Sequence, residues 1–483
     1  MFITTLLVTF CAAAPSSPKE IVFPEYVFTP PVSEEFREFI LDGIPVFIAE
    51  DQELPLINLV ATFRGGRYLD DTKNVGLTGM MASLVRDGGT ESMSAEELDE
   101  KFAFLAAGAS VRAGGSTTTA SLNSLSSNFE ESFDLFLDML QHPGFQQSRI
   151  HLKKADMIEG MKQRNDYPSS ILGRENSSVL FGDSYLGREV TKENIDSITE
   201  VDLRSKHKAI INPSNLILSV SGDFDKDEML LFLTEKLSGW ERGDVSDDPP
   251  DVISDFDPGV YYVDRDVPQG GVRISLRSFR RDDPDAEAAV VMNYILGGGG
   301  FSSRITQKVR SDEGLAYSAG SQFSAGVWSD GVWSAGFESK SPTVALAAKL
   351  VFDEVNRIKT ELVSEEDLSL AKSAIIEQFP SNFQSKAGTL SVFVSDDLSK
   401  RDPQYWSNFR NKIGAITAED VMDVANRVLR PEDMAVVIVG NWDEINKGDA
   451  GGRATIGDIK DIVGGDIVEL PLRDPLTLKV VNE

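Results

Sequence analysis

The chain of 483 residues has 41% hydrophobic and 26% charged residues, the composition of a globular protein, and a formal net charge of −30. This acidic balance excludes nucleic acid as a partner, because phosphate binding needs clustered Lys and Arg. The length exceeds one typical hydrophobic core, so we expect two domains of about 200 residues each.

The first residues predict an export signal. Residues 1–14, MFITTLLVTFCAAA, are apolar and end in three alanines, like a signal peptide with a small-residue cleavage site, although no basic residue precedes Lys19. We therefore expect a periplasmic or secreted protein with an N-terminal extension over residues 15–34. Cys11 is the sole cysteine, so the mature chain is expected to have no disulfide or thiolate site. Lipid attachment at Cys11 is an alternative that the bulky Phe10 disfavours.

The first domain is predicted over residues 35–243. The segments IPVFIAED (44–51) and INLVATFRGG (57–66) have strand patterns. Ser94 and Glu97 have the spacing of a capping box and begin a predicted helix. Apolar residues at helical spacing predict another helix that faces the core: Phe129, Phe133, Phe136, Leu137 and Leu140.

The second domain is predicted over residues 258–447, after an acidic linker that contains prolines at 244–257. The second domain also opens with strand patterns, GVYYVDRD (259–266) and GVRISLRS (271–278). Residues 448–483 form a C-terminal tail. We expect its segment VELPLRDPLTL (468–478), rich in proline and apolar residues, to pack in extended form on the body or on a partner. No segment after the signal approaches 18 continuous apolar residues, so no membrane span is expected.

Two smaller motifs lie in the second domain. Glycines 297–300 lack the G-K-[ST] ending of a phosphate loop, which favours a flexible loop or a helix end. The segment VWSDGVW (327–333) predicts a hairpin that turns at Asp330 and Gly331, with Trp328 and Trp333 on its strands. We expect the tryptophans to lie in the core, with a substrate platform as the alternative.

The two domains repeat each other. Residues 197–225 and 415–443 share five identities at a constant offset of 218. These are Ile198, Thr199, Asp202, Pro213 and Gly222, which recur as Ile416, Thr417, Asp420, Pro431 and Gly440. In each copy the Thr and Asp approximate a capping box, the proline ends the helix, and an apolar strand stops at the glycine. The predicted fold class is therefore α+β, with two homologous domains, each a mainly antiparallel sheet covered by helices.

One stretch of the second domain carries a family resemblance. The segment LGGGGFSSRITQKVRSDEGLAYSAG (296–320) places Arg310 and Tyr317 seven residues apart, with Gly314 between them. It resembles the pitrilysin/insulinase and mitochondrial-processing-peptidase family of inverted zincins, whose second-type domain carries R-x-x-x-G-L-x-Y. The resemblance covers roughly residues 35 to 445.

The resemblance implies one half of a clamshell peptidase. Two such units, on one or two chains, enclose a chamber in which zinc hydrolyses a peptide, and one unit supplies H-x-x-E-H and a distant glutamate. By this resemblance Arg310 and Tyr317 would bind the substrate backbone and stabilise the tetrahedral intermediate from across the chamber. A guanidinium fork and a phenol are suitable donors for that task. An arginine paired with a surface carboxylate and a tyrosine packed on a sheet remain the alternative.

The metal motif itself is lost. Segment 74–90, NVGLTGMMASLVRDGGT, lies where the family has its zinc helix, so Gly79, Ala82 and Ser83 replace the first histidine, the glutamate and the second histidine. The family's third ligand falls at Gly160, beside Glu159. Two imidazoles one helical turn apart are needed to hold zinc there, and these residues cannot replace them.

No other part of the chain supplies the missing ligands. The only histidines are His142, His151 and His207, and no two of them are four residues apart. We therefore expect no cofactor in this chain and zinc on a partner.

The first half also lacks the Arg/Tyr pair. When the two halves are aligned so that Gly108 matches Gly314, Phe104 takes the place of Arg310 and Val111 takes the place of Tyr317.

These observations predict a catalytically incomplete subunit of a heterodimeric zinc peptidase. Arg310 and Tyr317 would act on peptides at a zinc site of a homologous H-x-x-E-H subunit. The alternative from another class is a non-catalytic peptide-binding or scaffold protein. A third alternative is a peptidase that is active alone and binds zinc through ligands outside the family motif.

Overall fold

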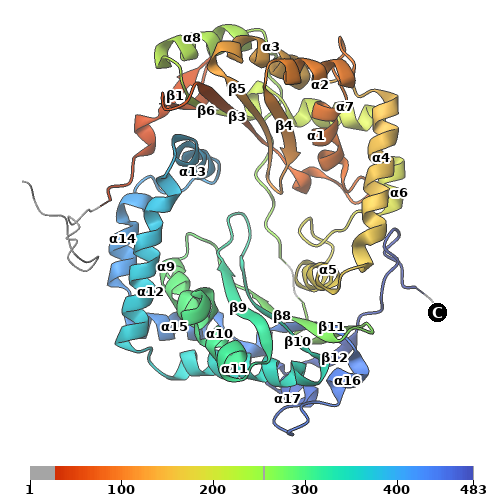
Figure 1. Ribbon diagram of the computed structural model, residues 1–483, viewed down its shortest axis with the longest axis vertical. Coiled ribbons are helices and arrows are strands. Elements are labelled where there is room, and N and C mark those ends of the chain that lie inside the picture. Colours follow the sequence, from red (N-terminus) through yellow and green to blue (C-terminus); the bar gives the residue numbers. More distant parts are fainter. Residues whose placement is uncertain (1–27, 254–255, 482–483) are drawn as a thin grey trace, which may run out of the picture.

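The computed structural model describes residues 28–253 and 256–481. The predicted signal peptide over 1–14 and the alternative lipid site at Cys11 lie outside these residues. Two six-stranded sheets face each other across the centre of the molecule, and helices cover the outer face of each (Figure 1). The predicted α+β class, with one largely antiparallel sheet in each half, is confirmed.

The first sheet has the strand order β1-β2-β6-β3-β5-β4. All its strand pairs are antiparallel except β2 and β6. Its strands are β1 (Arg37–Ile40), β2 (Ile44–Glu50), β3 (Leu56–Arg64), β4 (Gly108–Ala113), β5 (Thr117–Leu125) and β6 (Leu216–Gly222). The helices of this half are α1 (Leu77–Asp87), α2 (Ala95–Phe104), α3 (Phe129–Gln141), α4 (Gln147–Lys162), α5 (Pro168–Phe181), α6 (Lys192–Ser197), α7 (Glu200–Ile210) and α8 (Lys226–Leu237).

The second sheet has the order β12-β7-β11-β8-β10-β9. Its strands are β7 (Gly259–Asp264), β8 (Gln269–Arg277), β9 (Ala316–Ser324), β10 (Val332–Lys340), β11 (Ala435–Gly440) and β12 (Asp466–Glu469). The helices are α9 (Ala286–Asn293), α10 (Arg304–Thr306), α11 (Val344–Thr360), α12 (Glu365–Gln378), α13 (Lys386–Leu398), α14 (Tyr405–Ala415), α15 (Ala418–Val428), α16 (Trp442–Asn446) and α17 (Ile456–Val463), with π-helical turns η7 (Tyr294–Gly298) and η9 (Gln307–Asp312).

The strand orders show the internal repeat in three dimensions. Strands β2, β6, β3, β5 and β4 occupy the same places in the first sheet as β7, β11, β8, β10 and β9 in the second. The predicted capping boxes are present at Thr199 with Asp202 and at Thr417 with Asp420. The sixth strand differs, because β1 precedes its neighbour in the chain and runs antiparallel to it, whereas β12 comes from the C-terminal tail and runs parallel to β7.

Each half contributes one helix to the inner face of the other half's sheet. Helix α13 of the second half packs on β2 and β6, and α5 of the first half packs on β8 and β11 (Figure 1). The contact of α13 is aromatic and aliphatic: the ring of Phe393 lies 6.4 Å from Phe47 and 5.7 Å from Phe36, and Ile217 is buried beside them. Strands β6 and β11 are therefore buried along their whole lengths.

The hairpin between β9 and β10 differs in part from its prediction. Trp333 lies on β10 and is fully buried, with its indole N–H donating to Asn293 Oδ1 at 3.1 Å. Trp328 lies in the connection and not on a strand, because the amides of Gly326 and Gly331 both donate to the carbonyl of Phe279 and hold the connection against the end of β8.

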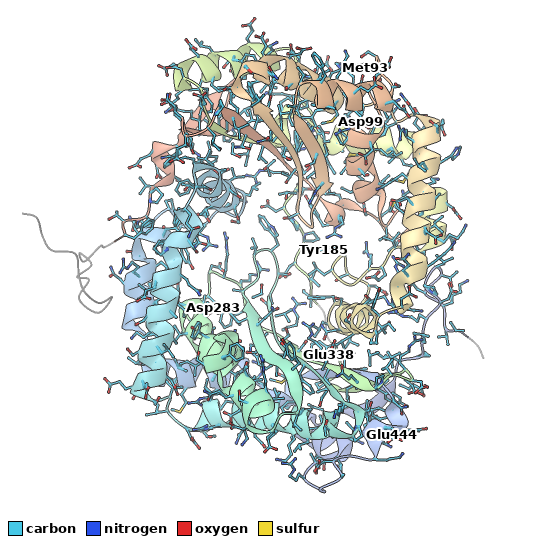
Figure 2. The ribbon with its side chains drawn as sticks, viewed as in Figure 1. Met93, Asp99, Tyr185, Asp283, Glu338 and Glu444 are labelled. Atoms are coloured by element: carbon cyan, nitrogen blue, oxygen red, sulfur yellow. The ribbon has the colours of Figure 1, made fainter. Side chains whose placement is uncertain are left out.

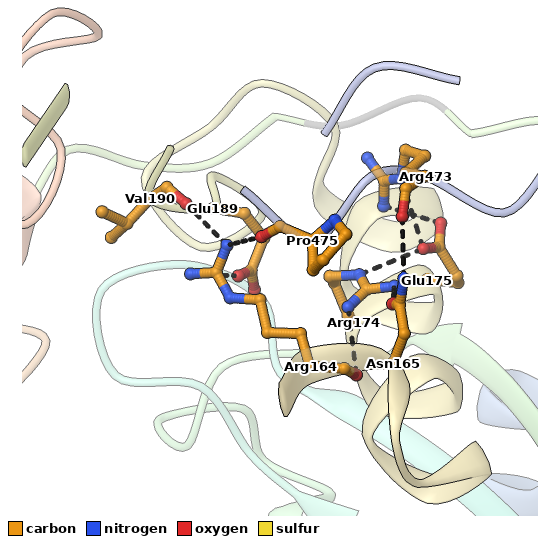
Figure 3. Close-up of polar contacts among 8 residues, drawn as sticks. All are labelled: Arg164, Asn165, Arg174, Glu175, Glu189, Val190, Arg473 and Pro475. Carbon is orange, nitrogen blue, oxygen red and sulfur yellow. Dashed lines mark hydrogen bonds and ion pairs between the residues drawn. The ribbon is translucent and has the colours of Figure 1, made fainter. Parts of the chain in front are cut away.

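The C-terminal tail crosses back to the first half (Figure 3). Arg473 donates to the buried Glu175 at 2.7 Å and 3.3 Å, and Arg174 donates to the same carboxylate at 3.2 Å. Asn165 Nδ2 donates to the carbonyl of Arg473 at 2.9 Å, and Arg164 donates to the carbonyl of Pro475 at 3.2 Å. The tail thus links β12 of the second sheet to the α4–α5 region.

Removing the Phe393 ring tests the helix exchange. We expect Phe393→Ala to lower the free energy of unfolding by about 3 to 5 kcal/mol, the usual cost of deleting a buried ring. Amides of β2 and β6 should lose hydrogen-exchange protection, although the substitution lies in the other half of the chain. Ser391→Ala on the same helix, where the side chain is exposed, is the control. Unchanged protection in β2 and β6 would contradict this packing.

Removing the Arg473 guanidinium tests the tail. Arg473→Met leaves the buried Glu175 with Arg174 alone, so we expect a loss of about 2 kcal/mol in urea unfolding. Lys479→Ala, an exposed change in the same tail, should have no measurable effect. Equal stability of both variants would show that the ion pair does not hold the tail.

Candidate functional site

Arg310 lies between two aromatic rings on the surface of the second half. Its guanidinium carbon is 4.4 Å from the ring centroid of Phe301 and 4.9 Å from that of Tyr317. Phe301 and Tyr317 are 69% and 86% exposed. We call these three residues the aromatic–arginine stack. The structure thus brings the predicted pair Arg310 and Tyr317 together.

Local structure explains how the stack forms. Arg310 lies in the π-helical turn η9, Gly314 takes a φ of +62° where the chain reverses, and Tyr317 is the second residue of the edge strand β9. A Cβ at Gly297 would come within 2.4 Å of the Ser321 backbone, so only glycine lets η7 approach β9 this closely. The glycine run thus packs against the middle of β9, and Phe301, which directly follows the run, contacts Arg310.

The guanidinium of Arg310 is available to a ligand. It makes no hydrogen bond or ion pair with any residue in 28–253 or 256–481, which argues against the alternative of a surface ion pair. The two cation–π contacts leave its N–H groups without a protein acceptor, so they can donate to a carbonyl or carboxylate oxygen. The exposed phenol of Tyr317 can donate to the same region.

Sequence reasoning missed Phe301. An aromatic residue directly after a glycine run, in a segment predicted as a loop, was the available signal. Phe301 lies nine positions before Arg310, so helical spacing does not pair the two residues; the turns at η7 and η9 do.

The four positions that the sequence resemblance assigns to the metal motif, Gly79, Ala82, Ser83 and Gly160, lie on α1 and α4, which pack beside each other. A Cβ at Gly79 or at Gly160 would meet no atom within 4 Å. Ala82 is buried, and Ser83 donates to Asp87 within the same helix at 2.9 Å. None of these four positions presents a zinc-ligating atom suited to replace imidazole.

A buried aspartate fixes the beginning of α1. Asp70 accepts hydrogen bonds from the amides of Gly76 and Thr78, each at 3.1 Å, and lies 3.7 Å from the Lys206 ammonium. Burial raises the pKa of Asp70, and the hydrogen bonds from Thr78 oppose that rise. The Asp70 carboxylate thus satisfies backbone amides at the beginning of α1.

The three histidines lie at separate places in the first half of the chain. His142 Nδ1 lies 3.1 Å from Asp138 Oδ1 at the end of α3, and His151 is exposed on α4. A ring nitrogen of His207 lies 2.8 Å from the carbonyl of Leu140. Within residues 28–253 and 256–481 no three His, Cys, Asp or Glu side chains are grouped so that they could hold a metal ion.

The counterparts in the first half do not form a second stack. Phe104 ends α2 and is 87% exposed, whereas Val111 on β4 is 6% exposed and faces the core. Val111 thus faces inward at the place where Tyr317 faces outward, so this half presents no donor pair.

Comparisons with known proteins find relatives over most of the chain. The profile of the family described as "Peptidase M16 inactive domain" matches residues 197–375. The "Non-peptidase homolog YmxG" of Helicobacter pylori is 24% identical over 409 residues, 82% of this chain and 92% of that protein. An "Uncharacterized zinc protease" of Rickettsia felis is 23% identical over 393 residues, 80% of this chain and 92% of that protein.

Solved structures share the fold. A peptidase M16 inactive domain from Pseudomonas fluorescens has a TM-score of 0.75 at 21% identity over 84% of this chain and 97% of that chain. The periplasmic protease PqqL from Escherichia coli has a TM-score of 0.69 at 16% identity over 89% of this chain and 49% of that chain. A chain of Complex III2 from Candida albicans has a TM-score of 0.68 at 13% identity over 88% of this chain and 99% of that chain.

Together these matches confirm the family resemblance inferred from the sequence. In the part of the chain that the structure describes, no helix combines the length and the apolar character that crossing a bilayer requires.

The partly buried His207 should make stability depend on pH. Burial lowers the pKa of His207 below its usual 6.5. The unfolded chain therefore binds a proton there more readily, and the stabilising contribution is lost as the pH falls from 7 through 6. We expect His207→Gln to lose less free energy of unfolding between pH 7 and pH 5 than the wild type, as measured by urea titration. The exposed His151→Gln should keep the wild-type slope; an unchanged slope in His207→Gln would contradict the assignment.

Proposed function

Because this chain is a relative of the M16 peptidases in which the metal motif has been lost, we propose that it is the metal-free subunit of a two-chain zinc peptidase. Its role is to present Arg310 and Tyr317 to a peptide bound at the zinc site of a homologous H-x-x-E-H subunit. The observation that carries this proposal is the free guanidinium of Arg310, held between two exposed rings on a chain whose own metal helix has no ligands.

The chemistry assigned to this chain follows from donor geometry. The Arg310 fork donates N–H groups to carbonyl oxygens of the substrate backbone and orients the scissile peptide. The Tyr317 hydroxyl donates to the oxyanion that develops when water adds to the carbonyl. Gly79, Ala82, Ser83 and Gly160 do not fit a zinc ion, so no step on this chain runs through a metal.

Two observations favour a partner. The fold of this chain covers only 49% of PqqL, so that single chain has room for a second unit of similar size. The stack lies on the surface and not in an enclosed site, so a second surface is needed to exclude water from the reaction. We also propose export to the periplasm or the exterior, in line with the predicted signal.

A second candidate function is a scaffold or peptide-binding subunit without catalysis. The observation that favours it is the likeness to a chain of Complex III2, a multi-subunit assembly. In that case the aromatic–arginine stack would bind a peptide or a partner subunit and would not take part in hydrolysis.

Reconstitution distinguishes the two functions. The chain should be purified from its native host together with whatever accompanies it, and peptide hydrolysis should be measured with and without a zinc chelator. We expect no hydrolysis by the isolated chain and zinc-dependent hydrolysis by the pair. Tyr317→Phe should lower kcat by about 100- to 1000-fold, as the loss of an oxyanion donor does. Arg310→Ala should lower kcat/KM by about 100-fold, because it removes the group that orients the scissile peptide.

Matched controls make that result specific. Arg310→Lys keeps the charge but not the planar fork, so it should recover little activity. Arg410→Ala on α14 removes an arginine away from the stack and should leave kcat unchanged. Full hydrolysis by the pair with Arg310→Ala, or tightly bound zinc and turnover in this chain alone, would overturn the proposal.

A further inference from the structure

Phe301 is the one member of the aromatic–arginine stack to which the proposed chemistry gives no task. Its ring is 69% exposed, and the ring centroid lies 4.4 Å from the guanidinium carbon of Arg310. In the part of the chain that the structure describes, the ring pairs with no other aromatic ring. A phenyl ring carries no hydrogen-bonding group. The contact with Arg310 is therefore the main specific interaction that Phe301 makes.

The backbone that carries Phe301 is held in place by hydrogen bonds. Phe301 lies in a 3₁₀ turn, directly after Gly300, whose φ is +61°. The hydroxyl of Ser303 lies 2.7 Å from the carbonyl oxygen of Gly300 and 2.9 Å from Thr306 Oγ1. Thr306 Oγ1 donates in turn to the carbonyl of Ala319 on β9 at 2.7 Å. The turn is therefore tied to the same strand that carries the other ring of the stack.

No carboxylate fixes the orientation of Arg310. Glu313, in the same segment, pairs with Arg453 at 2.7 Å. Glu338, labelled in Figure 2, lies on β10 opposite Tyr317, where the register of β9 and β10 shifts, and no ion pair joins it to Arg310. Within the described part of the chain, the two cation–π contacts are thus the interactions that orient this guanidinium.

We propose that Phe301 is a positioning residue, which orders the Arg310 side chain before a ligand arrives. A free arginine on a surface samples many rotamers, and ordering it on binding costs conformational entropy. A ring contact restricts those rotamers in advance, so less of that cost falls on the binding step. Tyr317 supplies the second ring, but its hydroxyl has to reach the substrate. That the ligand is a peptide rests on the proposed function.

Nuclear magnetic resonance of the isolated full-length chain tests the contact itself. With ¹⁵N-labelled arginine, the Nε–H signal of Arg310 is identified by its loss in Arg310→Lys. Phe301→Leu keeps an apolar side chain but removes the ring current, so it should move this signal downfield and lower its heteronuclear NOE. Phe301→Tyr should keep both values. Phe104→Leu, at a phenylalanine of the first half that is 87% exposed, is the matched control and should change neither.

Kinetics of the reconstituted pair test what the contact does. Phe301→Leu should lower kcat/KM about two- to fivefold, the factor that an exposed cation–π contact provides, and Phe301→Tyr should retain the wild-type value. In an Arg310→Ala background, Phe301→Leu should have no further effect, because the two residues act as one unit. Thermal unfolding verifies that each variant is folded.

Three results would overturn the proposal. The first is an Arg310 signal that does not respond to Phe301→Leu. The second is an active pair in which Phe301→Leu leaves kcat/KM unchanged. The third is an equal loss with and without Arg310, because Phe301 would then contact the substrate itself. The resonance experiment needs neither partner nor zinc, so failure to obtain an active pair would count against the proposed function and still leave the ordering of Arg310 decided.

Discussion

The architecture depends on the reciprocal covering of the two sheets. Each half closes its outer sheet face with its own helices, but the inner face of each is closed by a helix from the other half, α13 on β2 and β6, and α5 on β8 and β11. Removing this cover would expose Phe47 and Ile217 in one half and Val437 and Val439 in the other. Burial of that apolar surface fixes the spacing of the halves and so creates a cavity between them.

The same constraint explains why the surface stack is well formed. Strand β9 is the edge strand of a sheet whose central strand β11 is buried throughout. The beginning of β9, which carries Tyr317, therefore belongs to a well-packed sheet. The glycine run allows η7 to pack directly on β9, and this contact places Phe301 against Arg310. An exposed group can therefore be held in place by the rigid element beneath it.

Helix α1 has an apolar buried face, and Ala82, at one of the positions expected to carry the metal motif, belongs to it. Met80, Met81, Leu84 and Val85 form the buried face of that helix, and they remain fully apolar. Gly79 and Gly160 project toward open space, where a side chain is not needed for packing. The packing of α1 therefore does not depend on metal-ligating residues at these positions.

The sequence alone determined the α+β class, the internal repeat and its capping boxes, and the pair Arg310 and Tyr317, because these depend on local spacing and on matching segments within the chain. The sequence also predicted the strands that end at Gly222 and Gly440, which are β6 and β11. Which helix covers each strand, the place of Trp328, the pairing of β12, and the contact of Phe301 with Arg310 were decided only by tertiary structure. The physical reason is that periodicity records how much apolar surface a segment must bury, whereas the surface that buries it can come from any part of the chain.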